Sequence, residues 1–283
     1  MKGEDKYWTE VILPKKGNFD LRLHELWHFK DLLSLLVRRD FVSVYKQTVL
    51  GPAWYFIQPL LTTLMMWVVF SKIAHISTDS LPPVLFYLIG NIAWSYFAAC
   101  LNKTSNTFIA NAGIFGKVYF PRLIIPLSTV VSSLFAFFTQ LILFAGFLIY
   151  YVYQGFDFHV NIGLLVIPYF IFLMALLGLG MGIIISSLTT KYRDLSFLLV
   201  FGVQLYMYIT PVIYPVSSIS VELRKYILLN PMTSVIEGFR YAFLGKGMLD
   251  FGQIIYTTVF SIVVLLIGVL IFNKVERNFM DTV

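Results

Sequence analysis

The sequence predicts an all-α, polytopic membrane protein with six transmembrane helices, an N-terminal amphipathic interface helix and a re-entrant helical hairpin between spans five and six. Of the 283 residues, 58% are hydrophobic and only 13% are charged, about half the charged fraction of a typical soluble domain. Several apolar runs approach the roughly 20 residues that a helix needs to cross a bilayer. The alternating segments of about ten residues that are typical of a membrane barrel do not occur.

Six apolar runs are the expected spans: Ala53–Phe70, Val84–Leu101, Leu123–Tyr153, Ile162–Leu188, Leu195–Val212 and Ile254–Phe272. Lys and Arg concentrate in the cytosolic loops of membrane proteins. Sixteen of them fall on the side of the two termini, against five on the other side. We therefore expect residues 1–52 to be a cytosolic N-terminal segment, 53–273 the transmembrane domain and 274–283 a cytosolic tail.

The segment before the first span has the pattern of an amphipathic helix. Residues 19–37, FDLRLHELWHFKDLLSLLV, place apolar side chains at helical spacing and polar ones on much of the remaining surface. Such a helix lies in the plane of the membrane interface. Arg38, Arg39 and Lys46 follow it and would attract anionic headgroups by about 1 kcal/mol each. A simple interfacial anchor is the alternative interpretation.

Between the fifth and sixth spans, residues 219–229 and 233–244 form two short helical patterns broken by Asn230-Pro231. A helix of eleven residues reaches only about 17 Å, which is too short to cross. Irregular backbone at membrane depth is tolerated where protein or a water-filled cavity covers it. We expect a re-entrant outer gate at about residues 216–245, with a surface cap as the alternative.

The spans contain no Asp, Glu, Lys, Arg or His. Ion-coupled transporters keep ionisable groups inside the bilayer because their mechanism needs them, so coupling to a proton or ion gradient is excluded. Gly245-Lys246 resembles the end of a phosphate-binding loop, but Arg240 and Gly247 replace the required first glycine and final hydroxyl. We expect this chain to bind no nucleotide, metal or other cofactor, and to have no catalytic residues.

The spans do contain aromatic and neutral polar side chains. Aromatic rings can lie against the flat C–H faces of sugars, and amides can bond to hydroxyls, so a charge-free lining would let a polymer pass without a deep trap. Membrane-interface belts are the alternative role for the aromatic residues. The candidate channel-lining residues are Trp54, Tyr55, Gln58, Tyr87, Asn91, Trp94 and Tyr206.

Four stretches carry a family resemblance. RDFVSVYKQTVLGPAWYFIQPL (39–60), IFGKVYFPRLIIPL (114–127), KYRDL (191–195) and LNPMTSVIEGFRYAFLG (229–245) occur in this order. Together they resemble permease subunits of type-2 ABC exporters, in the branch that exports polysaccharides such as O-antigen, capsule and teichoic acid.

The resemblance implies a homodimer that works with two copies of a separate ATPase, which would hold the ATP and Mg²⁺. The complex would move a lipid-linked polysaccharide across the bacterial cytoplasmic (inner) membrane, in contact with membrane lipid and without nucleic acid. Both termini would be cytosolic. The resemblance places five residues near the cytosolic entrance for substrate, where a diphosphate would need cations: Arg38, Arg39, Tyr45, Lys46 and Gln47.

The resemblance also implies two elements that contact the ATPase, and an outer gate. Residues 106–117 would be a coupling helix, with Phe115 and Lys117 as contacts. The second element would comprise Tyr192, Arg193 and Asp194, although a basic residue in any short cytosolic loop explains Arg193 equally well. The outer gate would comprise Asn230, Pro231, Glu237 and Arg240, of which the last two could equally form a surface pair at i, i+3 spacing.

Three other functions remain possible from the sequence. An ABC exporter of a small lipid or drug would share the coupling elements without needing a basic entrance. A membrane enzyme that transfers glycans would need ionisable residues facing a cavity, and the outer segment supplies candidates such as Glu222 and Arg224. A scaffold protein would not call for two cytosolic docking loops.

Overall fold

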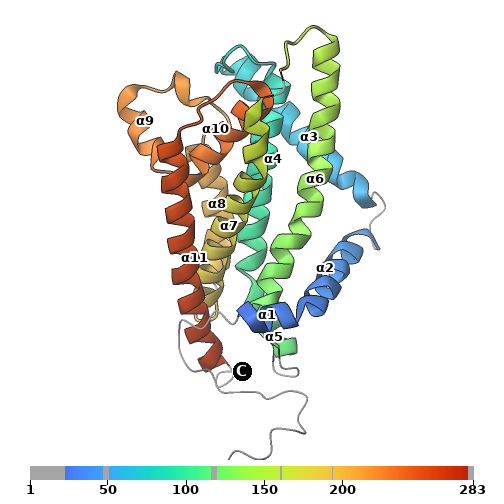
Figure 1. The fold of residues 1–283 in the computed structure, drawn as a ribbon, viewed down its shortest axis with the longest axis vertical. Coiled ribbons are helices and arrows are strands. Elements are labelled where there is room, and N and C mark those ends of the chain that lie inside the picture. Colours follow the sequence, from blue (N-terminus) through green and yellow to red (C-terminus); the bar gives the residue numbers. More distant parts are fainter. Residues whose placement is uncertain (1–22, 47–50, 116–119, 160, 193, 280–283) are drawn as a thin grey trace, which may run out of the picture.

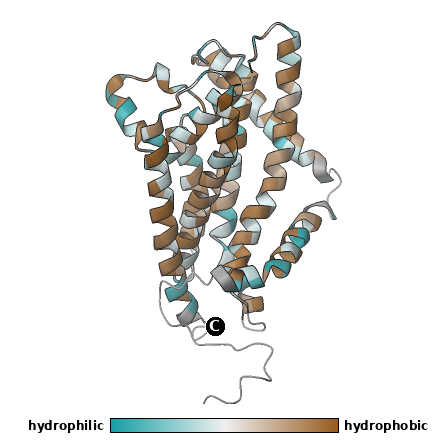
Figure 2. Cartoon of the chain, viewed as in Figure 1, coloured by the Kyte–Doolittle hydropathy of each residue, from teal (hydrophilic) through white to brown (hydrophobic). Residues whose placement is uncertain are grey.

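The fold is helical throughout the part of the chain that the computed structural model describes, residues 23–46, 51–115, 120–159, 161–192 and 194–279 (Figure 1). Five helical segments are long and apolar enough to cross a membrane. Hydrophobic residues extend along these segments, whereas hydrophilic residues gather on α2 and α9 (Figure 2). The five segments are α3 with η2 (Trp54–Met66 and Trp67–Ile73), α4 (Pro83–Thr104), α6 (Ile124–Tyr153), η3 with α7 (Ile162–Val166 and Ile167–Thr189) and α11 (Phe251–Phe279).

The fifth expected span is shorter in the structure than the sequence suggested. Helix α8 (Leu195–Ile209) has 15 residues and ends three residues before the expected boundary. Thr210 adopts an extended conformation, with ψ of 141°. Pro211 follows it, and the residue before a proline is disfavoured in the helical region.

The interface helix is longer than predicted. After α1 (Leu23–His28), α2 (Lys30–Tyr45) continues as one helix through the basic residues Arg38 and Arg39. Its Leu36 is buried, and α2 packs along α6 at the lower right of Figure 1. Gly51 then turns the chain toward α3 with a φ of +45°, which a residue with a side chain rarely adopts. Pro52 lies in the short 3₁₀ turn η1 (Gly51–Ala53) rather than inside α3.

Helix α4 forms the centre of the bundle. It contacts α3, α6, α7, α8 and α10, and the apolar stretch that qualifies it as a span is 83% buried. Because α4 is surrounded by protein, its polar residues face other helices rather than lipid. This position makes α4 the element on which an internal site would be built.

Glycines let α7 pack closely between α4 and α11. A Cβ on Gly178 would lie 2.7 Å from the Cβ of Cys100 in α4, and a Cβ on Gly182 would clash with Thr104 of the same helix. On the other side of α7, a Cβ on Gly180 would lie 2.9 Å from the Cα of Leu265 in α11. Small residues at such spacing allow membrane helices to approach backbone to backbone.

The segment between α8 and α11 contains two short helices, α9 (Val221–Leu228) and α10 (Pro231–Leu244), preceded by the 3₁₀ turn η4 (Val216–Ser218). None of the α9 residues is buried, whereas twelve of the fourteen in α10 are. Asn230 caps α10 by accepting a hydrogen bond from the Met232 N–H at 2.9 Å. Gly245 ends the helix in the left-handed conformation. The two helices therefore differ. Helix α9 is exposed, as expected for a surface cap, and α10 is buried, as expected for a re-entrant segment.

Candidate functional site

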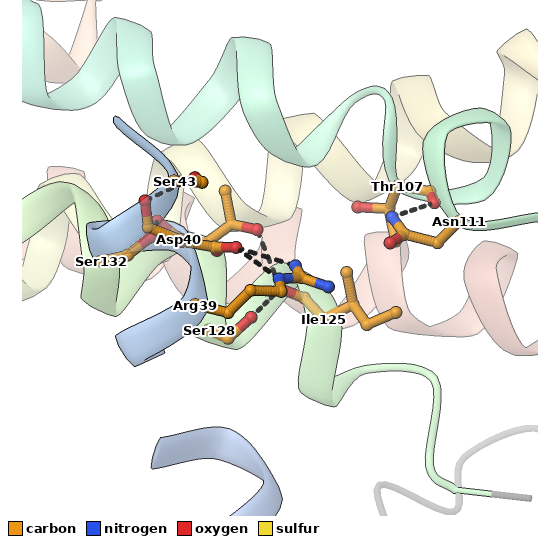
Figure 3. A network of polar contacts seen from close by, with 9 residues as sticks. Arg39, Asp40, Ser43, Thr107, Asn111, Ile125, Ser128 and Ser132 are labelled. Carbon is orange, nitrogen blue, oxygen red and sulfur yellow. Dashed lines mark hydrogen bonds and ion pairs between the residues drawn. The ribbon is translucent and has the colours of Figure 1, made fainter. Parts of the chain in front are cut away.

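The basic part of α2 faces the start of α6. The rings of Phe41 and Phe135 pack 4.9 Å apart and hold the two helices together. Arg39 is 46% exposed and donates to Asp40 Oδ1 at 2.8 Å. Figure 3 shows Arg39 reaching across the first turns of α6, near Ser128, toward the beginning of α5 (Thr107–Phe115).

The structure describes some of the other predicted entrance residues. Arg38 and Lys46 are exposed. Arg38 lies within α2, and Lys46 directly follows the helix, before the chain turns into α3. Tyr45 is the last residue of α2. Gln47 lies outside the described residues.

A polar cavity of about 230 Å³ lies between α3, α4 and α6. Its lining includes the amides of Gln58, Asn91 and Gln140, the hydroxyl-bearing Tyr96, and Lys103 near the end of α4. Among the described lining residues, Lys103 carries the one fixed charge. We refer to this cavity as the polar slot.

Three of the seven predicted channel-lining residues, Tyr55, Gln58 and Asn91, border the polar slot. The other four do not. Trp54 is exposed at the start of α3, and Tyr87 is fully buried in the core. Trp94 packs edge-on against Tyr206, with ring centroids 5.5 Å apart.

The predicted coupling helix, residues 106–117, is described as α5 up to Phe115. Lys117 lies outside the described residues. Phe108 fixes α5 to the bundle, because its ring stacks on Phe272 of α11 at 4.4 Å and its N–H donates to Ser186 Oγ of α7. The exposed apolar side chains of α5 are Ile109 and Ile114.

Phe115 lies in the core rather than on the surface, with 4% of its side chain exposed. It packs against Phe108 and Phe120, and the guanidinium of Arg122 lies 5.2 Å from its ring centroid. Arg122 in turn donates to the backbone oxygen of Glu276 at 3.0 Å. Burial lowers the pKa of the Arg122 guanidinium, and the Glu276 carboxylate opposes this shift. In this arrangement Phe115 can position α5 but cannot offer its ring to a partner.

In the second predicted coupling element, Tyr192 and Asp194 are exposed. Lys191 lies 5.3 Å from the centroid of the Tyr192 ring. Arg193 lies outside the described residues. The exposed residues are accessible to a partner.

Glu237 and Arg240 form a buried ion pair, so the surface-pair interpretation is wrong. Arg240 is 1% exposed and donates to Glu237 Oε1 at 2.9 Å. It also donates to the carbonyl oxygens of Val212 at 2.7 Å and Tyr214 at 3.3 Å. Its guanidinium lies 3.7 Å from the ring centroid of Phe86 in α4. Burial lowers the pKa of Arg240, and the Glu237 carboxylate opposes the shift, but a guanidinium stays protonated in proteins.

Asn230 ties the end of α8 to the start of α10. Its side-chain N–H₂ donates to Thr210 Oγ1 at 2.8 Å, and its Oδ1 accepts from the Tyr206 hydroxyl at 2.6 Å. Pro231 occupies the first turn of α10, where its missing N–H is not needed. Together with Arg240, these contacts fix α10 and the turn after α8 to the central helix α4.

Within the described part of the chain, no three His, Cys, Asp or Glu side chains are grouped as metal ligands would be. The sequence profile of the ABC-2 type transporters matches residues 31–244, which is most of the chain. This chain belongs to the ABC-2 type transporter family. An ABC-2 permease has no nucleotide site of its own, and it pairs with an ATPase that is a separate protein.

The relatives of this ABC-2 permease are polysaccharide exporters. The O-antigen export system permease protein RfbA of Klebsiella pneumoniae is 29% identical over 91% of this chain and 97% of its own length. RfbA of Myxococcus xanthus is 25% identical over 92% and 98%. The capsule polysaccharide export inner-membrane protein CtrC of Neisseria meningitidis serogroup A is 24% identical over 88% and 92%. The permease is therefore a multi-pass membrane protein whose relatives export polysaccharides.

The sequence interpretation missed part of the polar slot. Asn91, Ser95 and Lys103 fall on one stripe of α4 because they are four or eight residues apart. Ser133 and Gln140 form a similar stripe on α6. The signal was present as polar residues at helical spacing within apolar spans, but the sequence does not show that the two stripes face each other.

Proposed function

We propose that this chain is the permease subunit of an ATP-driven exporter that moves a lipid-linked, O-antigen-like polysaccharide across the bacterial cytoplasmic membrane. The observation that carries the proposal is the similarity to O-antigen permeases, which extends over 91% of the chain rather than over one motif. The polar slot supports it, because an exporter of apolar drugs or simple lipids would have no use for several amides inside an apolar bundle.

In this proposal the chain crosses the membrane six times, with both termini in the cytosol. Helix α8 would add the one crossing beyond the five long segments, and it is the fifth in chain order. Its 15 residues rise about 22 Å, and the extended chain from Thr210 adds to that length. The Lys and Arg distribution places α5 and the end of α11 on the cytosolic side. Helices α9 and α10 then lie at the outer side, where α10 enters the bundle as a re-entrant element and contributes to the gate.

The polysaccharide passes between two copies of the chain. Helix α8 supports this assembly, because Val203 is the one buried residue that it contributes. Its exposed side is large and apolar, with Phe197 79% exposed and Phe201 and Leu205 on the same helix. A homodimer with two ATPase copies would cover part of this surface and leave a passage along the dimer axis.

The cations of α2 receive the diphosphate of the lipid-linked substrate. Arg39 projects from α2 toward α5 and α6 and keeps about half of its surface exposed. Arg38, in the middle of α2, and Lys46, directly after its last residue, are both exposed, and we include Tyr45 and Gln47 in the entrance on the sequence resemblance alone. Charge-assisted hydrogen bonds from guanidinium groups to phosphate are strong and geometrically specific.

The test of this function is a charge reversal in α2. Arg39→Glu should abolish surface polysaccharide in cells, because a carboxylate at the entrance repels a diphosphate, while the protein still inserts in the membrane. Lys30→Glu is the matched control: it makes the same change on the same exposed helix, nine residues earlier, and should leave export intact. Normal export by Arg39→Glu would contradict the assigned entrance, and export of a non-saccharide substrate would contradict the function.

A further inference from the structure

Helix α4 lines one side of the polar slot. Asn91, Ser95, Ala99 and Lys103 line it at successive intervals of four residues, so they follow one face of the helix for about 18 Å. Gln140 approaches from α6 and Gln58 from α3. Lys103 stands one turn before Thr107 and therefore marks the end of the slot toward α5.

Two amides in the slot have no hydrogen-bond partner among the described residues. Asn91 is 4% and Gln140 9% exposed, and the structure gives neither side-chain amide a hydrogen bond among the described residues. The buried Tyr96 hydroxyl has only the thiol of Cys100 beside it, and no oxygen or nitrogen partner in the described part of the chain. A buried polar group without a partner costs about 1–3 kcal/mol. Groups that face a cavity and remain unpaired therefore point to a ligand or to water inside it.

The lining indicates the chemistry of that ligand. Neutral amides and hydroxyls both donate and accept hydrogen bonds, as hydroxyl groups require. The rings of Tyr55, Tyr96 and Phe137 add flat apolar surfaces between these polar groups. The single cation, Lys103, lies at one end only, and Arg39 points toward the same region of α5 and α6. This combination suits a polyhydroxylated ring joined to a phosphate at one end.

We propose that the polar slot binds one terminal sugar unit of a phosphate-linked saccharide inside each protomer, with the phosphate at Lys103. The inference rests on the proposed function and adds to it a binding site built from three helices of a single subunit, α3, α4 and α6. The amides of Asn91 and Gln140 contact the sugar hydroxyls. A slot filled only with water, which would hold about eight molecules at about 30 Å³ each, and a phospholipid headgroup site are the outcomes that the experiment must separate.

Thiol protection tests occupancy. The transporter, assembled with its ATPase in phosphatidylcholine nanodiscs, carries Cys100→Ala and Ala136→Cys, which places the one thiol in the slot. A polyprenyl diphosphate bearing a disaccharide should slow its reaction with a water-soluble maleimide at least fivefold. The same polyprenyl diphosphate without sugar, and added phosphatidylglycerol, should each change the rate less than twofold. Val221→Cys, exposed on α9, is the control thiol whose rate should not respond.

Other protection patterns would overturn the proposal. Equal protection by phosphatidylglycerol would make the slot a lipid headgroup site, and no protection by any probe would make it a water-filled cavity. A thiol that does not react at all would show a closed slot. If Ala136→Cys does not fold, Ser133→Cys, which also lines the slot, carries the same measurement.

Substitution of the amides tests recognition. Asn91→Leu and Gln140→Leu should each weaken binding of the disaccharide probe about three- to tenfold, the loss expected for one hydrogen bond, and leave the sugarless probe unchanged. Both variants should fold, because an apolar side chain replaces an unpaired buried amide. Gln154→Leu, the same change at the C-cap of α6 and outside the slot, should have no effect. Lys103→Met should weaken both probes by a similar factor.

The two proposals fail in different ways. If the amide variants bind the disaccharide probe and export polysaccharide normally while Arg39→Glu blocks export, the slot proposal is wrong and the proposed function stands. If the intact transporter neither binds the disaccharide probe nor increases its ATPase rate with it, the proposed function itself is wrong.

Discussion

At the scale of single residues, the Glu237–Arg240 pair is the most constrained feature of the molecule. Arg240 holds the carbonyls of Val212 and Tyr214 as well as the Glu237 carboxylate, and it lies on the ring of Phe86. Loss of one partner from a buried pair leaves an uncompensated charge, whereas an apolar replacement of both partners is often neutral. This asymmetry gives a direct prediction.

Arg240→Met should lower the free energy of unfolding by about 3–5 kcal/mol, because Glu237 is left charged and buried. The double variant Glu237→Leu/Arg240→Met should recover most of that loss. Arg224→Met on α9, where the guanidinium contacts Met248 rather than a carboxylate, should stay within about 0.5 kcal/mol. Thermal unfolding of the purified protein in detergent measures all three, and equal destabilisation by the single and double variants would contradict the pairing argument.

Residue identities in the sequence predicted part of this picture. The i, i+3 spacing of Glu237 and Arg240 predicted that they would meet, but their burial depends on α4, whose Gly90 lies next to the guanidinium, more than a hundred residues earlier in the chain. Phe115 could not be placed in the core from the sequence either. Its ring contacts Phe108, Phe120 and Arg122, which are close to it in the chain, but the sequence does not show that α5 packs on α7 and α11 through Phe108.

At the scale of elements, α5 is the short helix that we propose as the contact for the ATPase. Its inner side is fixed by Phe108 to α7 and α11, while Ile109 and Ile114 remain exposed. Exposed apolar side chains on an otherwise anchored helix are suited to a partner's groove.

The double variant Ile109→Asp/Ile114→Asp should reduce co-purification of the ATPase at least tenfold, because charges oppose burial in an apolar contact. The variant protein should still be recovered folded, since neither side chain is in the core. Ile162→Asp, which changes an equally apolar and more exposed side chain at the opposite end of the bundle, should co-purify normally. Unchanged ATPase recovery with the α5 variant would rule out this face as the contact.

Glycine packing gives a second prediction at this scale. Gly182→Val should destabilise the protein by about 1–3 kcal/mol or more, because the new side chain would occupy the position of Thr104 and approach the Leu101 carbonyl. Gly146→Val on α6, where nothing lies within 4 Å, should be neutral. Thermal unfolding compares the two, and similar melting temperatures would show that α7 does not depend on close contact with α4.

Element positions were largely predictable because apolar runs of 20 to 30 residues allow few alternatives. The helix ends were less so. The π-helical turns at Trp67–Ile73 extend the first span past its expected end, and Thr210 ends α8 early. The expected gate divided unequally into a buried α10 and an exposed α9, although the sequence interpretation had treated the two segments alike.

At the scale of the whole molecule, membership of the ABC-2 family means that the membrane permease and the ATPase that supplies the energy are separate proteins. The purified permease in lipid vesicles should therefore hydrolyse no ATP above a protein-free background, and activity should appear when the separate ATPase is added. Phosphate release measures both conditions. ATP turnover by the permease alone, persisting after further purification, would contradict this division.

The family was predictable from four motifs in order, because they span most of the chain, and the match to the ABC-2 family confirms it. The polar slot was not, since it needs α3, α4 and α6 together in space. Its residues are separated by up to 85 positions, from Tyr55 to Gln140, and no local pattern relates them.

The glycine contacts of α7 have a mechanical consequence. The backbone of α7 lies close to α4 on one side and to α11 on the other. Sliding of one of these three helices past another would cause steric overlap, so we expect the three to move as one rigid unit. Helix α5 is attached to this rigid unit through the contacts of Phe108 with α7 and α11. A force applied to α5 would therefore tilt α4, α7 and α11 together. A path opened by that movement would lie beside these three helices rather than between them.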